Sequence, residues 1–375
     1  MKQLLLSLFI LILSSSCGGN RQGATVAEGQ GDTLTMKYAQ LLTMVEHCNY
    51  WEVKIVNPWR TTQALHTYWV AKSTNTLSVP QGVTLIKRPL DRVVTFSTVH
   101  AGLLCMLHAE QKIVGMTDLN YVKHPLLLNA VKKGQITDMG SGLQPNIERI
   151  IEANAQALFV SPFENSGGYG KIETIGVPLI ECADYMEPTA LGRAEWMKFY
   201  GLLMGEQQTA DALFNEVEKA YLHLKNYARQ TKSRPTVMVD KMVGSVWYVP
   251  GGKSTLGVML ADAQMRYIYA DDEHSGSMAL PFERVLTDAK DADIWLMRYA
   301  SSPAAPYTLT TLLAEHHGYD RFKAWQQGTC YGCDTRMSRL FEETPFRPDF
   351  MLSDLIAIAH PESKRSSRYF FKIER

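Results

Sequence analysis

Basic and aromatic side chains supply the main recognisable binding chemistry of this sequence. Four basic residues, Arg193, Lys241, Lys253 and Arg298, are donors that can bind several oxygens of an anionic ligand at once. Aromatic rings instead offer flat area to a planar ligand. Most of these residues follow stretches predicted to be parallel strands, whose carboxyl ends face ligands in α/β proteins. The predicted ligand set is Ser97, Thr98, His100, Phe163, Asn165, Tyr169, Tyr185, Arg193, Lys241, Trp247, Tyr248, Arg298 and Tyr299.

One loop in this set has aromatic residues at both ends and glycines between them. It runs Phe163-Glu164-Asn165-Ser166-Gly167-Gly168-Tyr169, and its two glycines allow the backbone to bend closely around a ligand. For any one aromatic residue of the set, a place in the hydrophobic core is slightly favoured over contact with the ligand.

The sequence contains none of the common catalytic or phosphate-binding motifs. There is no GxSxG nucleophile elbow, no GxxxxGKS/T phosphate loop and no GxGxxG after a strand. Gly251-Gly252-Lys253-Ser254 lacks the leading glycine of a phosphate loop, because Trp247 stands there. The scattered histidines form no set that predicts a metal ion. We therefore expect a binding protein without catalytic residues, metal or cofactor, and keep an exported enzyme as an alternative.

The cysteines limit the possible disulfides. Six are present, and an odd number, five, remains after Cys17, which excludes complete internal pairing. Cys330 and Cys333 have the CxxC spacing of thiol oxidoreductases, but their neighbours predict a strand end or turn instead of the helix start that lowers a thiol pKa. A short disulfide or two unrelated thiols are favoured over a redox pair.

The composition is that of an ordinary globular protein. The chain has 375 residues, 46% hydrophobic and 20% charged, and this length predicts about two domains. Its 38 basic and 38 acidic residues cancel, which removes the electrostatic footprint of a dedicated nucleic-acid-binding protein. A small-molecule or protein partner is favoured.

Alternating strands and helices are expected to position the candidate residues. In the first half, strands are predicted over 53–56, 68–71, 92–96, 113–116, 157–160 and 177–180, and helices over 101–107 and 146–153. The first two strands predict a small antiparallel pair, and the others a mainly parallel sheet. An apolar stripe at spacings of three and four predicts one long helix over 206–230, which stops before Pro235. A second series of strands and helices begins with a strand over 236–239.

The predicted fold class is therefore α/β, with two Rossmann-like lobes of mainly parallel sheet joined by a single long helix. The predicted regions are a signal peptide over 1–17, a tether over 18–34, an N-terminal α/β lobe with its leading strands over 35–190, a connecting helical region over 191–231 and a C-terminal α/β lobe over 232–375.

The amino terminus resembles that of a bacterial lipoprotein. Lys2 precedes a mostly apolar run, Leu4 to Leu13, which is too short to span a bilayer. Ser14-Ser15-Ser16-Cys17 then resembles a lipobox, which implies a lipid on Cys17. Cleavage of a plain secretory signal is the alternative.

One pattern recurs in both halves. Ile147-Glu148-Arg149-Ile150-Ile151 and Phe282-Glu283-Arg284-Val285-Leu286 each precede a predicted buried strand at nearly the same distance. Both glutamates fall in a first helical turn, where the helix dipole favours a negative charge. The repeat is typical of duplicated α/β lobes, and helix-start stabilisation is the alternative to a functional role for the glutamates.

Four segments in order resemble the substrate-binding proteins of ABC importers for iron complexes, cobalamin and haem. They are Asn146–Ile151, Leu191–Trp196, Gly251–Leu256 and Pro348–Leu355, the last followed by His360-Pro361-Glu362. The resemblance implies two α/β lobes joined by one rigid helix, with a metal chelate in the cleft between them. It also implies that Glu148 and Glu283 match the family's lobe-tip glutamates, which pair with arginines of the permease.

The resemblance further implies a periplasmic lipoprotein, held at a membrane only by its lipid and expected to be a monomer. Its partners would be a small metal chelate and an ABC permease dimer with its ATPase subunits. The basic residues favour an iron chelate of siderophore type, while the aromatic residues keep cobalamin and haem as alternatives. A ligand-binding lipoprotein outside transport, such as a sensor, is a further alternative.

Overall fold

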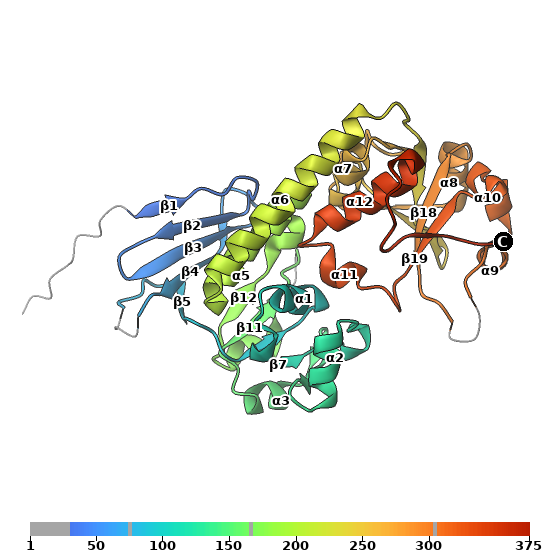
Figure 1. Cartoon of the computed structure of the whole chain (residues 1–375). Coiled ribbons are helices and arrows are strands. Elements are labelled where there is room, and N and C mark those ends of the chain that lie inside the picture. Colours follow the sequence, from blue (N-terminus) through green and yellow to red (C-terminus); the bar gives the residue numbers. More distant parts are fainter. Residues whose placement is uncertain (1–30, 74–76, 165–167, 303–305) are drawn as a thin grey trace, which may run out of the picture.

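The computed structural model describes residues 31–73, 77–164, 168–302 and 306–375. Two residues of the predicted sites, Cys17 and Asn165, lie outside these ranges. Within them, no helix combines the length and apolar character needed to cross a membrane. Figure 1 shows an N-terminal β-sheet, two α/β lobes and a long helix that runs between the lobes.

The N-terminal lobe is built on a parallel sheet in the order β12-β11-β6-β7-β8. Its strands are β6 (Val93–Thr95), β7 (Ile113–Met116), β8 (Thr137–Asp138), β11 (Ala157–Val160) and β12 (Leu179–Glu181). Helices α1 (Thr98–Met106), α2 (Pro125–Lys132) and α3 (Ile147–Glu152) and the hairpin of β9 (Gly140–Ser141) and β10 (Gln144–Pro145) lie between them. β6 and β11 are buried along their whole length, as continuous apolar strands of a covered parallel sheet should be.

The C-terminal lobe repeats this arrangement with the sheet order β16-β13-β18-β19-β20, in which only the β19–β20 pair is antiparallel. Its strands are β13 (Thr236–Val239), β16 (Arg266–Tyr267), β18 (Ile294–Tyr299), β19 (Cys330–Asp334) and β20 (Phe371–Lys372). Its helices are α7 (Thr255–Asp262), α8 (Phe282–Ala289), α9 (Leu309–Glu315), α10 (Lys323–Gln327), α11 (Leu340–Glu343) and α12 (Pro348–Ala359). A small antiparallel sheet contains β14 (Met242–Val243), β15 (Val246–Pro250) and β17 (Ser277–Leu280).

Three helices connect the lobes: α4 (Ala190–Glu195), α5 (Met197–Met204) and α6 (Gln207–Gln230). The long helix predicted over 206–230 is α6, and it packs against α5 at one side and α12 at the other. Its apolar stripe is buried as the spacing predicts, at Ala210, Phe214, Val217, Tyr221 and Leu224.

The N-terminal sheet is larger than the predicted antiparallel pair. Its strands β1 (Asp32–Leu34), β2 (Leu42–Glu46), β3 (Tyr50–Val56), β4 (Ala64–Ala71) and β5 (Val83–Lys87) pair in chain order. The predicted tether over 18–34 is therefore wrong at its end, because residues 32–34 pair with 44–46 as strand β1. A strand of three residues is too short to show a period of two, so the sequence pattern did not reveal it.

Candidate functional site

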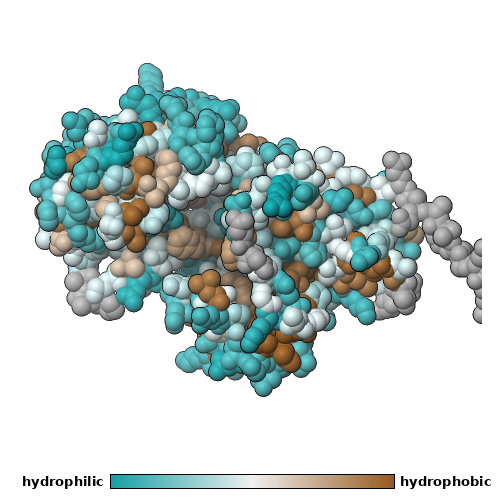
Figure 2. All heavy atoms as spheres, turned by 180° about the vertical axis from the view of Figure 1, so that it is seen from behind, coloured by the Kyte–Doolittle hydropathy of each residue, from teal (hydrophilic) through white to brown (hydrophobic). Residues whose placement is uncertain are grey.

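Several cavities lie at the junction of the two lobes. Figure 2 shows a hollow in the surface there, with hydrophobic atoms beside it. The N-lobe cavity, about 740 Å³, includes Phe96, Asp118, Tyr121, Phe163 and Tyr169. The central cavity, about 360 Å³, includes Ser97, Thr98 and Lys123 from one lobe and Ser338, Phe341 and Glu342 from the other. The C-lobe cavity, also about 360 Å³, includes Asp240, Lys241, Tyr248, Arg298 and Tyr299. Shared lining residues make the N-lobe and central cavities neighbours.

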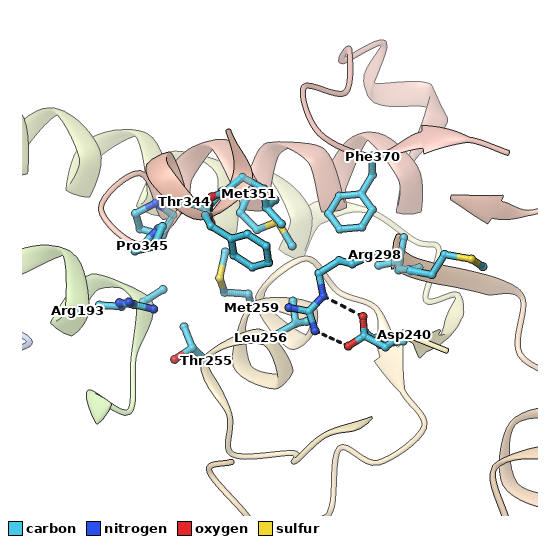
Figure 3. Close-up of a pocket in the computed structure, with 17 residues that line it drawn as sticks. Arg193, Asp240, Thr255, Leu256, Met259, Arg298, Thr344, Pro345, Met351 and Phe370 are labelled. Carbon is cyan, nitrogen blue, oxygen red and sulfur yellow. Dashed lines mark hydrogen bonds and ion pairs between the residues drawn. The ribbon is translucent and has the colours of Figure 1, made fainter. Parts of the chain in front are cut away.

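A fourth space, the hinge pocket, lies between α4 and the helices of the C-terminal lobe. It measures about 210 Å³ and is mostly apolar, with Leu256 and Met259 from α7, Met351 from α12 and Phe370 in its wall. It is large enough for a ring-sized apolar group, since an apolar cavity of about 150 Å³ holds benzene. Arg193 points toward the pocket from α4, and Arg298 lies on another side next to Asp240 (Figure 3).

Arg298 is held by a carboxylate at the end of the neighbouring strand. Its Nε donates to Asp240 Oδ1 at 2.9 Å and its Nη2 to Asp240 Oδ2 at 2.5 Å. Burial by itself would lower the pKa of Arg298, but this two-point pairing raises it above its usual value. Asp240 directly follows β13 and has φ +62°, which turns the chain sharply at the carboxyl end of the strand. The guanidinium is thus fixed at the cleft and stays charged.

Arg193, on the connecting helix α4, is held by a fully buried carboxylate of the N-terminal lobe. Its Nε donates to Asp184 Oδ2 at 3.0 Å, while His100 and Tyr200 contact Asp184 Oδ1, each at 3.1 Å. Burial would raise the pKa of Asp184, but the charge of Arg193 and the bond from His100 lower it. Among the described residues, none accepts a hydrogen bond from Nη1 or Nη2 of Arg193. The outer edge of this guanidinium is therefore available to a ligand.

Two predicted ligand residues belong to the core. His100 is 2% exposed and contacts Asp184 inside the N-terminal lobe, because it lies on the inward face of α1. Trp247 is completely buried, donates to the carbonyl oxygen of Val239 at 3.1 Å and stacks on Trp295. Successive residues of a strand face opposite sides, so Tyr248 is half-exposed in the C-lobe cavity instead.

Of the other predicted ligand residues, most line the walls of the cavities and one does not. Ser97 and Thr98 line the central cavity; Phe163 and Tyr169 line the N-lobe cavity, where the Tyr169 hydroxyl donates to Glu181. Tyr185, which lines none of the four spaces, donates its hydroxyl to the carbonyl oxygen of Pro162.

Lys241 and Tyr299 line the C-lobe cavity, and both contact the ring of Tyr307. Lys241 forms an ion pair with Glu315, and its Nζ lies 5.6 Å from the ring centre of Tyr307. Tyr299 stacks on Tyr307 with ring centres 4.0 Å apart. Tyr307 therefore supports both walls.

Several cavity residues were not predicted, namely Asp118, Tyr121, Lys123, Asp240, Phe341 and Glu342. The carboxyl-end rule that selects Ser97 and Lys241 applies equally to Asp118 and Tyr121 after β7 and to Asp240 after β13. Phe341 and Glu342 carry no such signal, because they lie on a short helix that follows a loop.

The two cysteines of the CxxC segment are free thiols on β19. Residues three apart on a strand face opposite sides, which separates the two sulfur atoms. Burial raises the pKa of Cys330 to about 12 and that of Cys333 to about 11. They are thus two unrelated thiols, as one sequence alternative holds. In the ranges that the structure describes, no group of three or more His, Cys, Asp or Glu side chains could hold a metal ion.

Glu148 and Glu283 lie in the first turns of α3 and α8, one in each lobe. Both side chains are exposed, and neither forms an ion pair with another described residue. The helix starts differ: the Asn146 side chain caps α3, whereas Pro281 precedes α8 without a side-chain cap. Their exposure leaves both carboxylates free to meet a partner.

Comparison with known proteins finds similar sequences and similar structures. An uncharacterized lipoprotein of Methanocaldococcus jannaschii is 29% identical over 300 residues, which cover 77% of this chain and 70% of that protein. A periplasmic heme binding protein from Pseudomonas aeruginosa has the same fold, with TM-score 0.59, 18% identity and coverage of 76% of this chain and 99% of that chain. An ABC-type Fe3+-hydroxamate transport system protein from Saccharomonospora viridis gives TM-score 0.56 and 17% identity, over 72% and 93% of the two chains.

The sequence pattern described as "periplasmic binding protein" matches residues 93–337, about two thirds of the chain. The matched segment contains the parallel strands of both lobes, α6, both arginines of the cleft, Glu148 and Glu283. The two-lobed α/β fold expected from the sequence is thus present together with the family's own pattern. This chain belongs to the periplasmic binding protein family, a class of solute-binding proteins.

Proposed function

We propose that this protein is the substrate-binding component of an ABC importer and that it captures an anionic ferric chelate of siderophore type in the cleft between its lobes. The observation that supports this most is the pair of arginines at the hinge pocket, Arg193 from the N-terminal side and Arg298 from the C-terminal lobe. Guanidinium groups bind carboxylate and catecholate oxygens through paired, charge-assisted hydrogen bonds. The apolar wall beside them suits the organic part of a chelate.

The two arginines differ in how much of each remains for a ligand. Arg298 uses Nε and Nη2 on Asp240, whereas Arg193 uses only Nε on Asp184. Arg193 thus keeps its two terminal amino groups for an anion, and its buried partner prevents it from swinging away. We expect Arg193 to contribute more to ligand affinity than Arg298.

Haem is the second candidate, and exposed aromatic residues favour it. Tyr121, Tyr248 and Phe341 are 71%, 48% and 45% exposed along the cleft cavities. Haem is planar and also carries two carboxylates, so it suits both the rings and the arginines. Cobalamin is supported less, because Trp247 contributes to the core and not to the cleft.

The ligand class can be tested on the protein without its signal segment and with Cys17 removed. Quenching of tryptophan fluorescence would be followed on addition of a ferric catecholate, ferric citrate, a neutral ferric hydroxamate, haemin and cyanocobalamin. A hydrogen bond to a charged group contributes about 1.5–3 kcal/mol, so Arg193→Gln should weaken binding of an anionic chelate about 10- to 100-fold.

Lys253→Gln is the matched control, because Lys253 is 56% exposed and lies outside the four spaces described above. Its affinity for the same chelate should equal that of the wild type. Tight binding of cyanocobalamin alone, unaffected by Arg193→Gln, would contradict the proposal.

Two further parts of the proposal concern location and docking. Cys17 carries a lipid that holds the protein at a membrane of the periplasm, and Glu148 and Glu283 dock the two lobes onto arginines of the permease dimer. Because the lipid supplies an anchor that the short apolar run does not, Cys17→Ser should release folded protein into the soluble fraction. Unchanged retention of the Cys17→Ser variant in membrane pellets would contradict the lipid anchor.

A further inference from the structure

A short helix of the C-terminal part of the chain packs against the N-terminal lobe. This helix is α11, which follows β19 and contacts α1 (Figure 1). The contact depends on Gly102: a Cβ atom at that position would lie 2.3 Å from the carbonyl oxygen of Glu342. The backbones of the two helices thus meet at a distance that only glycine allows. The lobes are therefore joined at a second place besides the connecting helices.

The side chain of Glu342 completes this junction. Its carboxylate is buried, with the residue 2% exposed, and Oε1 accepts hydrogen bonds from the backbone nitrogens of Lys123 at 2.7 Å and His124 at 3.1 Å. These nitrogens belong to the two residues directly before α2, and the second of them, His124, is the N-cap residue and makes no side-chain cap bond. The first backbone N–H groups of a helix need acceptors from outside it, and a carboxylate there also interacts favourably with the helix dipole. Glu342 therefore caps a helix of the opposite lobe.

The junction lies in the floor of the cleft. Lys123 and Glu342 both line the central cavity, as do Thr98 at the start of α1 and Phe341 next to Glu342. Movement of α11 away from α1 and α2 would change the distance between the two walls of this cavity. The same hydrogen bonds therefore hold the lobes and set the width of the cleft.

We propose that Glu342 is a positioning residue: by capping α2 from the other lobe it fixes the width of the central cavity, so that the cleft is preformed before ligand arrives. The mechanical part of this proposal does not depend on the ligand. Its role in capture rests on the proposed function. A preformed site binds more tightly because fewer groups must be ordered on binding.

The adjacent Glu343 offers a matched control. It is also buried, but it accepts from the Tyr369 hydroxyl at 2.6 Å and pairs with Arg339, so its contacts stay within the C-terminal part of the chain. Glu343→Ala should lower the melting temperature without moving the lobes. Glu342→Gln keeps one acceptor oxygen and should fall between the wild type and Glu342→Ala.

Two ligand-free measurements test the junction in the intact protein. Glu342→Ala should accelerate hydrogen exchange at the amides of Lys123 and His124 at least tenfold. It should also broaden the distance distribution between spin labels at the exposed positions 152 and 290, one in each lobe. The labelled protein lacks Cys17, and Cys48→Ser removes the one cysteine that is exposed among the described residues. Gly102→Ala should broaden the same distribution while Glu342 stays intact, since its methyl group pushes α11 away.

Unchanged exchange and label distances in Glu342→Ala, or changes equal to those of Glu343→Ala, would overturn the positioning role. With ferric citrate as the probe, Glu342→Ala should weaken binding at least threefold relative to Glu343→Ala. Failure of the wild type to bind ferric citrate or any other chelate of the panel would count against the proposed function only, because exchange and label distances are measured without ligand.

Discussion

At the scale of single residues, each cleft arginine is held by an aspartate that lies next to it in the same part of the molecule. Asp184 orients Arg193, and Asp240 orients Arg298. A side chain that is already ordered loses less conformational entropy when it binds a ligand. The paired carboxylates offset part of the positive charge of the two arginines, so any preference for an anionic ligand would come from the amino groups that the aspartates leave unpaired.

Mutation of Trp247 tests whether its side chain belongs to the hydrophobic core or to the wall of the cleft. Because this ring is completely buried among Trp295, Phe282 and Tyr319, Trp247→Ala should lower the free energy of unfolding by about 3–5 kcal/mol. Tyr248→Ala, next to it but half-exposed, should change it by less than about 0.5 kcal/mol. Chemical denaturation of both variants provides the comparison. A loss below about 1 kcal/mol for Trp247→Ala would place the ring in the cleft wall after all.

Asp293 gives the folded protein a specific acid sensitivity. Its carboxylate accepts from the backbone nitrogen and hydroxyl of Thr236 and from Lys323 Nζ. Burial would raise the pKa of Asp293, but these bonds outweigh it and lower the pKa to about 2. Since the folded pKa lies below the unfolded value, the stabilisation is present above about pH 4 and is lost as the pH falls toward 2.

Asp293→Asn should therefore remove part of the fall in melting temperature between about pH 4 and pH 2. Thermal unfolding across that range measures it. Asp291→Asn, at an exposed neighbouring position, should retain the wild-type profile. An identical profile in Asp293→Asn and the wild type would show that these bonds contribute no acid sensitivity.

At the scale of elements, two buried carboxylates attach the N-terminal sheet to the connecting helices. Glu195 accepts from the backbone nitrogens of Lys37, Tyr38 and Ala39 at 2.8–3.0 Å. Glu187 accepts from the next two nitrogens, those of residues 40 and 41, and from the Trp196 indole. Five consecutive backbone N–H groups thus find their acceptors on or next to α4. This sheet lies before the family's matched segment, yet it is part of the same packed structure.

Removing either carboxylate should loosen this attachment. Glu195→Ala leaves three backbone N–H groups without their acceptors, and a single unsatisfied buried group costs about 1–3 kcal/mol; we expect a loss of roughly 3 kcal/mol and faster hydrogen exchange over residues 37–39. Glu218→Ala is the control. Among the described residues, Glu218 bonds to the side chains of Lys37 and Tyr38 near the surface, where such a pair contributes little to stability. Equal effects of the two variants would show that surface pairing holds the sheet.

The parallel strands were predictable because each is a short, continuous apolar run followed by a turn or helix start, as in β6, β11 and β13. The helix α6 was predictable from its stripe. Of the N-terminal sheet only the antiparallel pair β3 and β4 was predicted, because β1 is very short and β5 has no alternating burial. In the cleft, the carboxyl-end rule locates backbone positions, but it does not tell which side chain turns inward. For that reason the prediction that His100 and Trp247 contact the ligand was wrong. Glu342 was missed because its hydrogen-bond partners are more than 200 residues away in sequence.

At the scale of the whole molecule, the lobes are joined through the connecting helices α4 to α6 and through the junction of α11 with α1. A single long helix already resists bending more than crossing loops do, and the second junction restrains the lobes further. Lobe closure on binding is therefore expected to be small. A nearly constant separation of the lobes would also keep Glu148 and Glu283 at a fixed spacing, as the docking role proposed for them requires.

The docking role proposed for these two glutamates can be separated from a role in helix stability. If both carboxylates contact permease arginines, Glu148→Ala or Glu283→Ala should weaken association with the permease, and the double variant should weaken it more. Replacement by Arg should weaken the association more than Ala because it adds repulsion, and added salt should weaken the wild-type complex.

If the glutamates only stabilise helices, each loss costs about 0.3–1 kcal/mol of folding stability and leaves uptake unchanged. The chelate affinity of the isolated protein should stay constant in every variant, since both residues lie outside the four cleft spaces. Normal uptake by the double Arg variant at normal protein level would leave Glu148 and Glu283 as helix-start charges and remove the main support for permease docking.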